Sequence, residues 1–231
     1  MKLQSLTDAA AVSRVYDDVL VPSFPMSELV TRDWVLDGVG DGTVTVVAAY
    51  EGEIPMAAAV TEVLSPGVML LSYLATLPAS RGSGIGSRLL DRVRQQVRRT
   101  GVGLLLAEVE RPDCHAGSAE HGDPTARLRF YARQGAVVLD LPYVQPPARP
   151  GAEPVPGMLL LALEIAPSLL RDAGGSIDGA VVARALDAIM GEERDDGPRE
   201  AALRAAARRP AVPLRHTEEW AAVEDSSAAP E

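Results

Sequence analysis

The chain alternates between apolar runs, which predict buried strands, and segments whose apolar residues recur at helical spacing. Residues 69–77 form an almost unbroken apolar run that ends at Pro78, so we expect a strand there. Apolar positions then recur at helical spacing until Gly101, a typical helix stop, which predicts a helix over 85–100. The expected order is strand, short glycine-containing turn, helix.

The same criteria predict the elements on either side. Thr7 or Asp8 is suited to cap a first helix that ends at Pro22, and a second helix is predicted over 26–39. Further strands are expected at 2–6, 43–50, 55–64, 102–109, 136–139 and 157–165, and a further helix at 125–134. The pattern is that of a mixed α/β chain.

Beyond residue 165 the pattern changes. Residues 178–190 have helical apolar spacing, 198–208 are rich in alanine and arginine and helix-prone, and 191–197 form a charged linker. After Pro210 the chain is polar, and we expect a mobile tail. An amphipathic helix at 178–190 has to bury its apolar face, either on its own sheet or on a second subunit. The sequence leaves both open, and the second would make the protein a homodimer.

Composition narrows the classes of function. The chain has 231 residues, of which 47% are hydrophobic but only 4% aromatic, so aliphatic side chains must fill the core. Its formal charge of −10 argues against a nucleic-acid partner and suits a cationic substrate. No run approaches the ~20 apolar residues of a membrane span, and the start is unlike a signal peptide. We therefore expect a cytoplasmic protein with no membrane partner. The single lysine and the abundance of arginine, alanine and glycine are typical of a bacterial source.

The turn before the helix at 85–100 carries the first candidate chemistry. The turn is short and consists mostly of residues with small side chains, with glycines at 82, 84 and 86. Glycine can take positive φ and lets the backbone approach a bound group closely. The N–H groups of a first helical turn, with the positive end of the helix dipole, form an anion site.

Two common phosphate-binding motifs do not fit this turn. A dinucleotide fingerprint needs a third glycine where Ser87 stands, and a nucleoside-triphosphate loop needs a lysine, whereas the only lysine is Lys2. A purely structural role stays open, in which the glycines merely make a tight strand-to-helix connection in an α/β domain.

The spacing Arg81-x-x-Gly84-x-Gly86 resembles the acyl-CoA pyrophosphate-binding motif of the GNAT superfamily of N-acetyltransferases. The preceding strand, the proline and the Leu89-Leu90 pair on the helix complete the resemblance. It implies acetyl-CoA as co-substrate, with the loop amides on the pyrophosphate and the strand along the pantetheine arm. The cofactor-binding residues that it implies are Leu74, Ala75, Thr76, Arg81, Gly82, Ser83, Gly84, Ile85, Gly86 and Ser87.

A second segment, 129–135, resembles the Phe-Tyr-x-x-x-Gly-Phe signature that follows the fifth strand of the same superfamily, with Ala136 in place of the last phenylalanine. An asparagine often found before the tyrosine is missing. The resemblance covers about residues 2–165. It implies a GNAT domain at 1–166, with a mixed, mostly antiparallel central sheet flanked by helices, followed by a C-terminal helical extension at 167–231.

Acetyl transfer to an amine requires removal of the amine's proton, stabilisation of an oxyanion and a proton for the departing thiolate. The resemblance assigns carbonyl polarisation to a backbone N–H within 74–76 and the thiolate's acid to Tyr131, whose alternative is core packing beside Phe130. Glu108 and Glu110 point to one face of their strand and are candidate bases. We favour Glu108, because it directly follows the apolar run. Either carboxylate could instead bind an ammonium group or form a surface ion pair.

Phe24, Tyr143 and Gln145 are the candidates for contact with the acceptor, because the family's loops at these places border its pocket; each could instead only fix its loop or pack on the core. Cys114, His115 and His121 lack the spacing of a metal site, so we expect no metal.

These observations predict an N-acetyltransferase that moves acetyl from acetyl-CoA to a primary amine by direct attack in a ternary complex. The acceptor is expected to be a small-molecule or peptide amine. The alternative is a non-catalytic acyl-CoA-binding or regulatory module with a C-terminal dimerisation arm.

Overall fold

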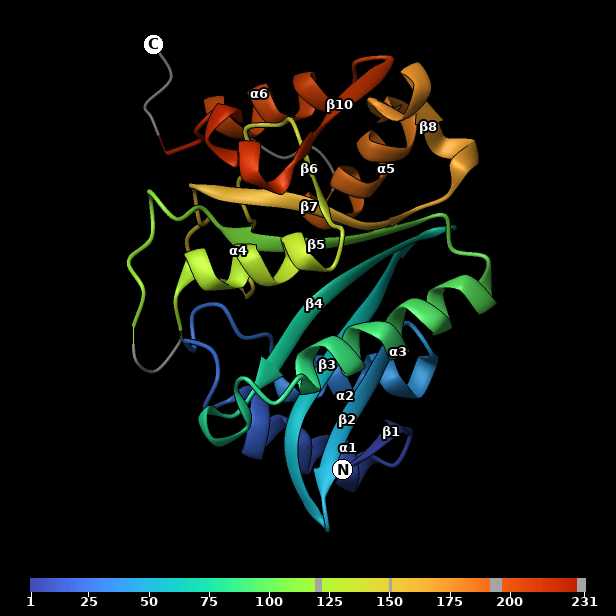
Figure 1. Ribbon diagram of the computed structural model, residues 1–231, viewed down its shortest axis with the longest axis vertical. Coiled ribbons are helices and arrows are strands. Elements are labelled where there is room, and N and C mark those ends of the chain that lie inside the picture. Colours follow the sequence, from blue (N-terminus) through green and yellow to red (C-terminus); the bar gives the residue numbers. More distant parts are fainter. Residues whose placement is uncertain (119–121, 150, 192–196, 228–231) are drawn as a thin grey trace. The chain divides into compact units, whose positions relative to one another are not determined.

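The computed structural model describes residues 1–118, 122–149, 151–191 and 197–227 (Figure 1). Its contacts divide the chain into two compact units. The first consists of Met1–Val63, Met69–Gly101 and Pro147–Ala152, and the second of Leu64–Val68, Val102–Pro146 and Glu153–Glu231. Each unit holds a series of neighbouring strands together with helices.

The strands of the first unit lie side by side in sequence order. They are β1 (Lys2–Leu6), β2 (Val44–Glu51), β3 (Ile54–Ser65) and β4 (Val68–Thr76). β2 pairs antiparallel with both β1 and β3. Gly52, in the turn from β2 to β3, has a φ of 60°, which glycine adopts without strain. The predicted strands of this half are confirmed, with shifts of a residue or so at their ends.

The helices of the first unit begin and end at recognisable caps. Asp8 accepts a hydrogen bond from the N–H of Ala11 at 2.9 Å, and α1 (Ala9–Val15) then continues into a π-helical turn (Tyr16–Leu20). α3 (Ile85–Thr100) ends at Gly101, whose φ of 71° is the left-handed helix stop that the sequence predicted.

The second helix starts later than predicted. α2 (Arg32–Asp41) is capped by Thr31, whose hydroxyl accepts from the N–H of Trp34 at 3.2 Å. The preceding residues are held in a loop because the hydroxyl of Tyr73, on β4, donates to the carbonyl of Glu28 at 3.0 Å and accepts from the N–H of Val30 at 2.9 Å. These long-range bonds occupy backbone groups that a helix beginning at residue 26 would need.

Aliphatic side chains from β1 to β4 and the first two helices form the core of the first unit, as the composition predicted. Its fully buried members include Val12, Val15, Val19, Leu29 and Val60. The centre of β2 and β3 is made of buried alanines.

The second unit has its own run of antiparallel strands. Their spatial order is β5 (Leu104–Glu110), β7 (Met158–Ile165), β6 (Val137–Leu139), β10 (Ala211–His216), β9 (Ser176–Asp178) and β8 (Leu170–Arg171). Each neighbouring pair in this order is antiparallel. The helices are α4 (Pro124–Arg133), α5 (Gly179–Met190) and α6 (Pro198–Ala207).

The C-terminal segment contains strands as well as the predicted helices. β8 and β9 precede α5, and β10 follows α6. β10 pairs with β6 through Leu214 opposite Leu139, and with β9 through Val212 opposite Ile177. A polar, mobile tail with no strand was predicted after residue 210, whereas the structure has β10 at 211–216. α5 buries Val182, Ala185 and Leu186 within its own chain, so its apolar face needs no second subunit.

Polar contacts hold the segment that follows β10. The guanidinium of Arg111, itself buried, donates to the carbonyl of Val223 at 2.7 Å and lies 5.4 Å from the ring centroid of Trp220. The buried hydroxyl of Ser226 donates to the carbonyl of Tyr143 at 2.6 Å. The expected mobile tail is thus packed as far as residue 227, and its last four residues lie outside the described ranges. Among the helices described, none is long and apolar enough to cross a membrane.

Candidate active site

The turn between β4 and α3 has the backbone geometry that its glycines predicted. Gly82 and Gly84 have φ values of 77° and 79°. A Cβ built on either glycine would have no described atom within 4 Å. Glycine is therefore favoured at these positions by the positive φ, and not by a lack of room for a side chain. The turn is tied internally, because the hydroxyl of Ser83 donates to the carbonyl of Ser80 at 2.6 Å.

Helix α3 leads directly out of this turn. Gly84 is its N-cap, and no side chain among the described residues caps the helix there. The first bond inside the helix runs from the N–H of Arg88 to the carbonyl of Gly84 at 3.2 Å. The N–H groups of Ile85 and Gly86 are therefore left for an anion, and the helix dipole adds partial positive charge.

The end of β4 presents the other predicted cofactor residues. Leu74 and Thr76 are half-buried and alternate with Ala75, which is buried. Arg81 lies exposed in the turn.

In the second unit, the structure joins three of the predicted residues into one cluster. Glu108 projects half-buried from β5, and its Oε1 accepts a short hydrogen bond from the hydroxyl of Tyr143. Its Oε2 accepts from the side-chain amide of Gln145 at 2.9 Å. Gln145 is itself fixed by a pair of backbone hydrogen bonds to Val155 at 3.0 and 2.9 Å. Hydrogen bonds to a charged acceptor are strong, so both oxygens of the Glu108 carboxylate are held in place.

Glu110, two residues along β5, has a different partner. Arg127 of α4 donates to its Oε2 at 2.7 Å, and Nδ1 of His115 lies 4.0 Å from its Oε1. Glu108 and Glu110 alternate with buried Val109, as expected for two side chains on one face of a strand. Glu110 is thus ion-paired with Arg127, whereas Glu108 accepts hydrogen bonds from Tyr143 and Gln145.

Tyr131 lies on α4 one turn after Arg127. Its side chain is buried, and burial raises the pKa of its phenol to about 12, although the charge of Arg127 acts in the opposite direction. The ring also packs edge-on against Phe130, with ring centroids 5.1 Å apart. The phenol is therefore protonated at neutral pH and able to donate a hydrogen bond.

Residues 41–135 match the family model of the acetyltransferase (GNAT) domain. This segment is therefore similar to a GNAT acetyltransferase domain. The matched range contains the glycine turn, α3, both candidate carboxylates and Tyr131. This match places the protein among the acyltransferases.

Solved structures share the fold. A GNAT-family protein from Bacteroides thetaiotaomicron superposes with a TM-score of 0.56 at 22% identity, covering 70% of this chain and 86% of that one. The yncA protein of Salmonella typhimurium, solved with its cofactor acetyl-CoA, gives 0.51 at 17% identity over 75% and 99% of the two chains. The paia N-acetyltransferase of Thermoplasma acidophilum, solved with coenzyme A, gives 0.50 at 11% identity over 71% and 99%. A comparison with curated proteins gives no match.

These comparisons agree with the predicted fold class. The GNAT domain is a mixed α/β structure with a central, mostly antiparallel sheet flanked by helices. The boundary predicted at residues 166 and 167 stays a prediction.

The three candidates for acceptor contact have structural partners. Phe24 packs edge-on against Tyr73 in the first unit, with ring centroids 4.9 Å apart. Tyr143 is fully buried and Gln145 half-buried, and both donate to Glu108. In this structure, Tyr143 and Gln145 position a carboxylate.

The remaining polar residues of the loop after β5 form local contacts. Cys114 lies within 3.5 Å of Asp113, Asp225 and Ser227, and burial raises the pKa of its thiol. Within the described ranges no group of three or more histidine, cysteine or acidic side chains could hold a metal ion. His121 lies outside those ranges.

Two polar residues of the first unit, Glu62 and Arg149, were not singled out from the sequence. The carboxylate of Glu62 on β3 accepts from the hydroxyl of Ser72 at 2.7 Å, and burial raises its pKa. The position of Glu62 within the apolar run at 55–64 could have indicated a buried carboxylate. Arg149 donates to the carbonyl of Leu29, and its place in a proline-rich segment gave no signal.

Proposed function

We propose that the protein is an N-acetyltransferase that transfers the acetyl group of acetyl-CoA to a primary amine by direct attack in a ternary complex. The observation that carries the proposal is the pair of left-handed glycines, Gly82 and Gly84, that leads into the uncapped N-terminus of α3. The GNAT match over this segment supports acetyl-CoA as the ligand, as do the relatives solved with acetyl-CoA and with coenzyme A.

The glycine turn is assigned to the pyrophosphate. Backbone N–H groups at a helix start bind phosphate oxygens through hydrogen bonds and the helix dipole. The N–H groups of Ile85 and Gly86 have the required orientation, and Arg81 adds a positive charge beside the turn. A backbone N–H within 74–76 is assigned to the thioester carbonyl, where it would stabilise the oxyanion.

Glu108 is assigned as the base. The hydrogen bonds from Tyr143 and Gln145 fix the orientation of its carboxylate, which accepts the proton of the amine. Glu110 is less suited, because it would have to give up its 2.7 Å ion pair with Arg127. The amine nitrogen attacks the acetyl carbon, its proton passes to Glu108 directly or through water, and the C–S bond breaks.

Tyr131 is assigned to the departing sulfur. The phenol of Tyr131, with its pKa raised to about 12, is a weaker acid than an ordinary alkyl thiol. It therefore keeps its proton and stabilises the departing thiolate by donating a hydrogen bond to the sulfur. The acceptor is assigned to the class of small-molecule or peptide amines, whose positive charge before deprotonation suits a protein of net charge −10.

A binding test decides the central claim. Isothermal titration with acetyl-CoA and with CoA should show saturable binding by the wild type and its loss in Gly84→Asp, because a carboxylate would occupy the anion site. Gly101→Asp is the matched control, because Gly101 stands at the other end of α3 with similar positive φ and open space around it. Absence of acetyl-CoA binding by folded wild type, or equal loss in both variants, would contradict the proposal. A screen of amines by thiol release then tests turnover.

A further inference from the structure

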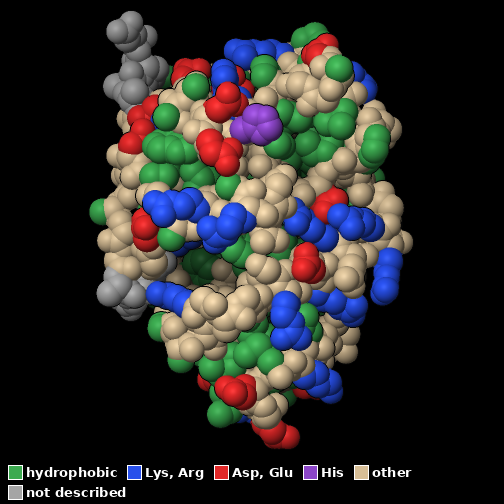
Figure 2. Space-filling model, viewed as in Figure 1, with side chains coloured by type: hydrophobic (Ala, Val, Ile, Leu, Met, Phe, Trp, Pro, Cys, Tyr) green, Lys and Arg blue, Asp and Glu red, His purple; other side chains and the backbone are tan. Residues whose placement is uncertain are grey.

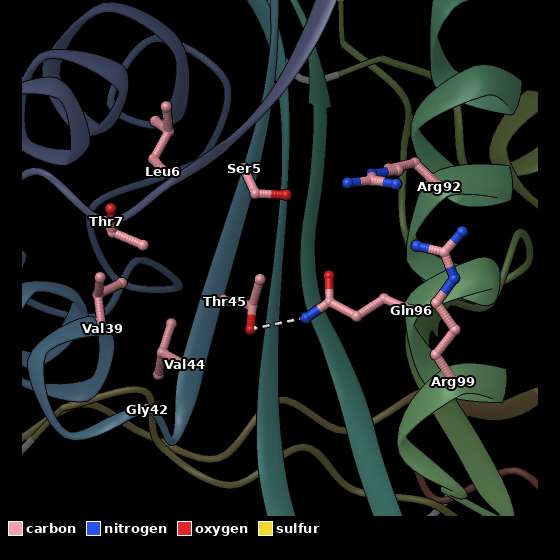
Figure 3. Close-up of a pocket in the computed structure, with 10 residues that line it drawn as sticks. All are labelled: Ser5, Leu6, Thr7, Val39, Gly42, Val44, Thr45, Arg92, Gln96 and Arg99. Atoms are coloured by element: carbon pink, nitrogen blue, oxygen red, sulfur yellow. Dashed lines mark hydrogen bonds between the residues drawn. The ribbon is translucent and has the colours of Figure 1, made fainter.

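The first unit contains a pocket farther along α3 from the glycine turn. Figure 3 shows it among the C-terminal half of α3, β1, the start of β2 and the end of α2. Its volume is about 360 Å³, within the range of about 300–1,000 Å³ usual for small-molecule sites. It is lined by Ser5, Leu6, Thr7, Val39, Gly42, Val44, Thr45, Arg92, Gln96 and Arg99.

Two arginines on one face of α3 dominate this lining. Arg92, Gln96 and Arg99 follow one another at spacings of four and three residues, so they share a helix face. The amide of Gln96 donates to the hydroxyl of Thr45 at 3.2 Å and links this face to β2. Figure 3 shows both guanidinium groups turned toward the space that the hydroxyl of Ser5 also faces.

The charge around these arginines is unusual for this chain. The protein has an excess of ten acidic charges, yet α3 carries five arginines and one aspartate, and Figure 2 shows basic side chains gathered over it. No carboxylate lines the pocket, and within the described ranges neither Arg92 nor Arg99 has a hydrogen bond or ion pair. Arginines elsewhere, such as Arg127, Arg171 and Arg215, pair with carboxylates at 2.7 Å or less.

The side chains that line the pocket indicate which class of ligand it would bind. Guanidinium groups bind carboxylate and phosphate oxygens through paired hydrogen bonds. The Cα atoms of Arg92 and Arg99 are separated by about 10 Å along the helix axis. Figure 3 shows the side chain of Arg99 running along α3 toward Arg92, so the two guanidinium groups face the same space. Leu6, Val39 and Val44 form an apolar part of the lining on the side of the pocket away from α3 (Figure 3), which suits the carbon framework of an organic ligand.

We propose that this pocket binds a small organic molecule that carries two oxyanion groups, one for each guanidinium group: a dicarboxylate or a bisphosphate. Gln96 lies about 18 Å along α3 from Gly84, so this ligand occupies a site distinct from the glycine turn. α3 links the two sites, which makes the ligand a candidate effector.

Titration of the full chain with adipate and with a hexose 1,6-bisphosphate tests the site and separates the two oxyanion classes. At least one probe should bind with one-to-one stoichiometry. Arg92→Gln and Arg99→Gln should each weaken that binding by about tenfold or more, the loss of one charged contact. Arg98→Gln, which removes the same charge from another face of α3, should change it less than about twofold. Circular dichroism of each variant establishes that it is folded.

Three results would overturn the proposal. The first is no saturable binding by folded wild type up to about 10 mM of either probe. The second is equal weakening by Arg98→Gln, which would indicate a diffuse charge effect. The third is binding that survives Arg92→Gln and Arg99→Gln but is lost in Gly84→Asp, which would place the anion on the glycine turn. None of these results depends on acetyl transfer, so the pocket and the proposed enzyme activity can fail separately.

Discussion

Tyr143 donates a hydrogen bond from its phenol to Oε1 of Glu108, although the two residues lie 35 positions apart in the chain. Gln145 donates to the other oxygen of the same carboxylate. A candidate base is therefore supplied with two fixed donors from a proline-rich segment that has little regular structure. These two hydrogen bonds determine the effects that we expect from substitution of Glu108, Tyr143 or Gln145.

Replacement of Glu108 by glutamine should lower kcat by about 10²–10⁴, the usual contribution of a general base. Glu110→Gln is the matched control, because it removes the same charge from the same face of β5 but breaks the ion pair with Arg127. We expect its effect on kcat to be much smaller. Initial rates of thiol release with a saturating amine would compare them, and a larger loss in Glu110→Gln would reverse the assignment.

Tyr143→Phe should lower kcat and leave the KM for the amine nearly unchanged, because Tyr143 acts through Glu108. The variant also removes a partly buried hydrogen bond to a carboxylate, which should lower the free energy of unfolding by about 1.5–3 kcal/mol. Steady-state kinetics and urea unfolding measure the two effects. A raised KM with unchanged kcat would instead mean that Tyr143 contacts the acceptor, as the resemblance first implied.

Features that depend on local backbone chemistry were predictable from the sequence. Gly82, Gly84 and Gly101 all have positive φ, and α3 and the strands β1 to β7 follow from apolar spacing. The start of α2 was not predictable, because it depends on hydrogen bonds from Tyr73 on β4.

Two further features could not be predicted from the sequence, because they depend on contacts between distant parts of the chain. β10 contains Pro213, which lacks an N–H and argues against a strand, yet its neighbours pair with β6 and β9 from distant parts of the chain. The cluster of Glu108, Tyr143 and Gln145 likewise forms only when the fold brings β5 and the proline-rich segment together. Sequence spacing indicated each member, but their mutual contact required the structure.

Burial of Tyr131 predicts a loss of stability in alkali. Its pKa is raised from 10.0 to about 12, so the folded state holds this proton between those values while the unfolded state releases it. Stability is therefore fully present below pH 10 and falls as the pH rises toward 12, by up to about 3 kcal/mol. Tyr131→Phe lacks this proton, so its free energy of unfolding should fall less steeply over the same range. Identical slopes for wild type and variant in urea unfolding would show that the phenol is not buried.

Replacement of Glu62 by an uncharged residue should stabilise the protein. Burial raises its pKa above 4.5, and the hydrogen bond from Ser72 only partly offsets that effect. The folded state therefore binds a proton that the unfolded state has released, and stability falls as the pH rises from 4.5 through the folded-state pKa. Glutamine keeps an oxygen that can accept from Ser72 and carries no charge. Glu62→Gln should thus raise the urea midpoint at neutral pH, and the gain should shrink as the pH approaches 4.5.

The exposed Glu53, in the turn from β2 to β3, is the matched control. Glu53→Gln removes the same formal charge and should leave the urea midpoint nearly unchanged at both pH values. The carboxylate of Glu53 is exposed to water in the folded state, so removing its charge relieves no desolvation cost. If both variants stabilise equally, the cause is the protein's net charge of −10 and not desolvation. If Glu62→Gln destabilises at neutral pH, the charged form of Glu62 must have a stabilising partner in the folded state.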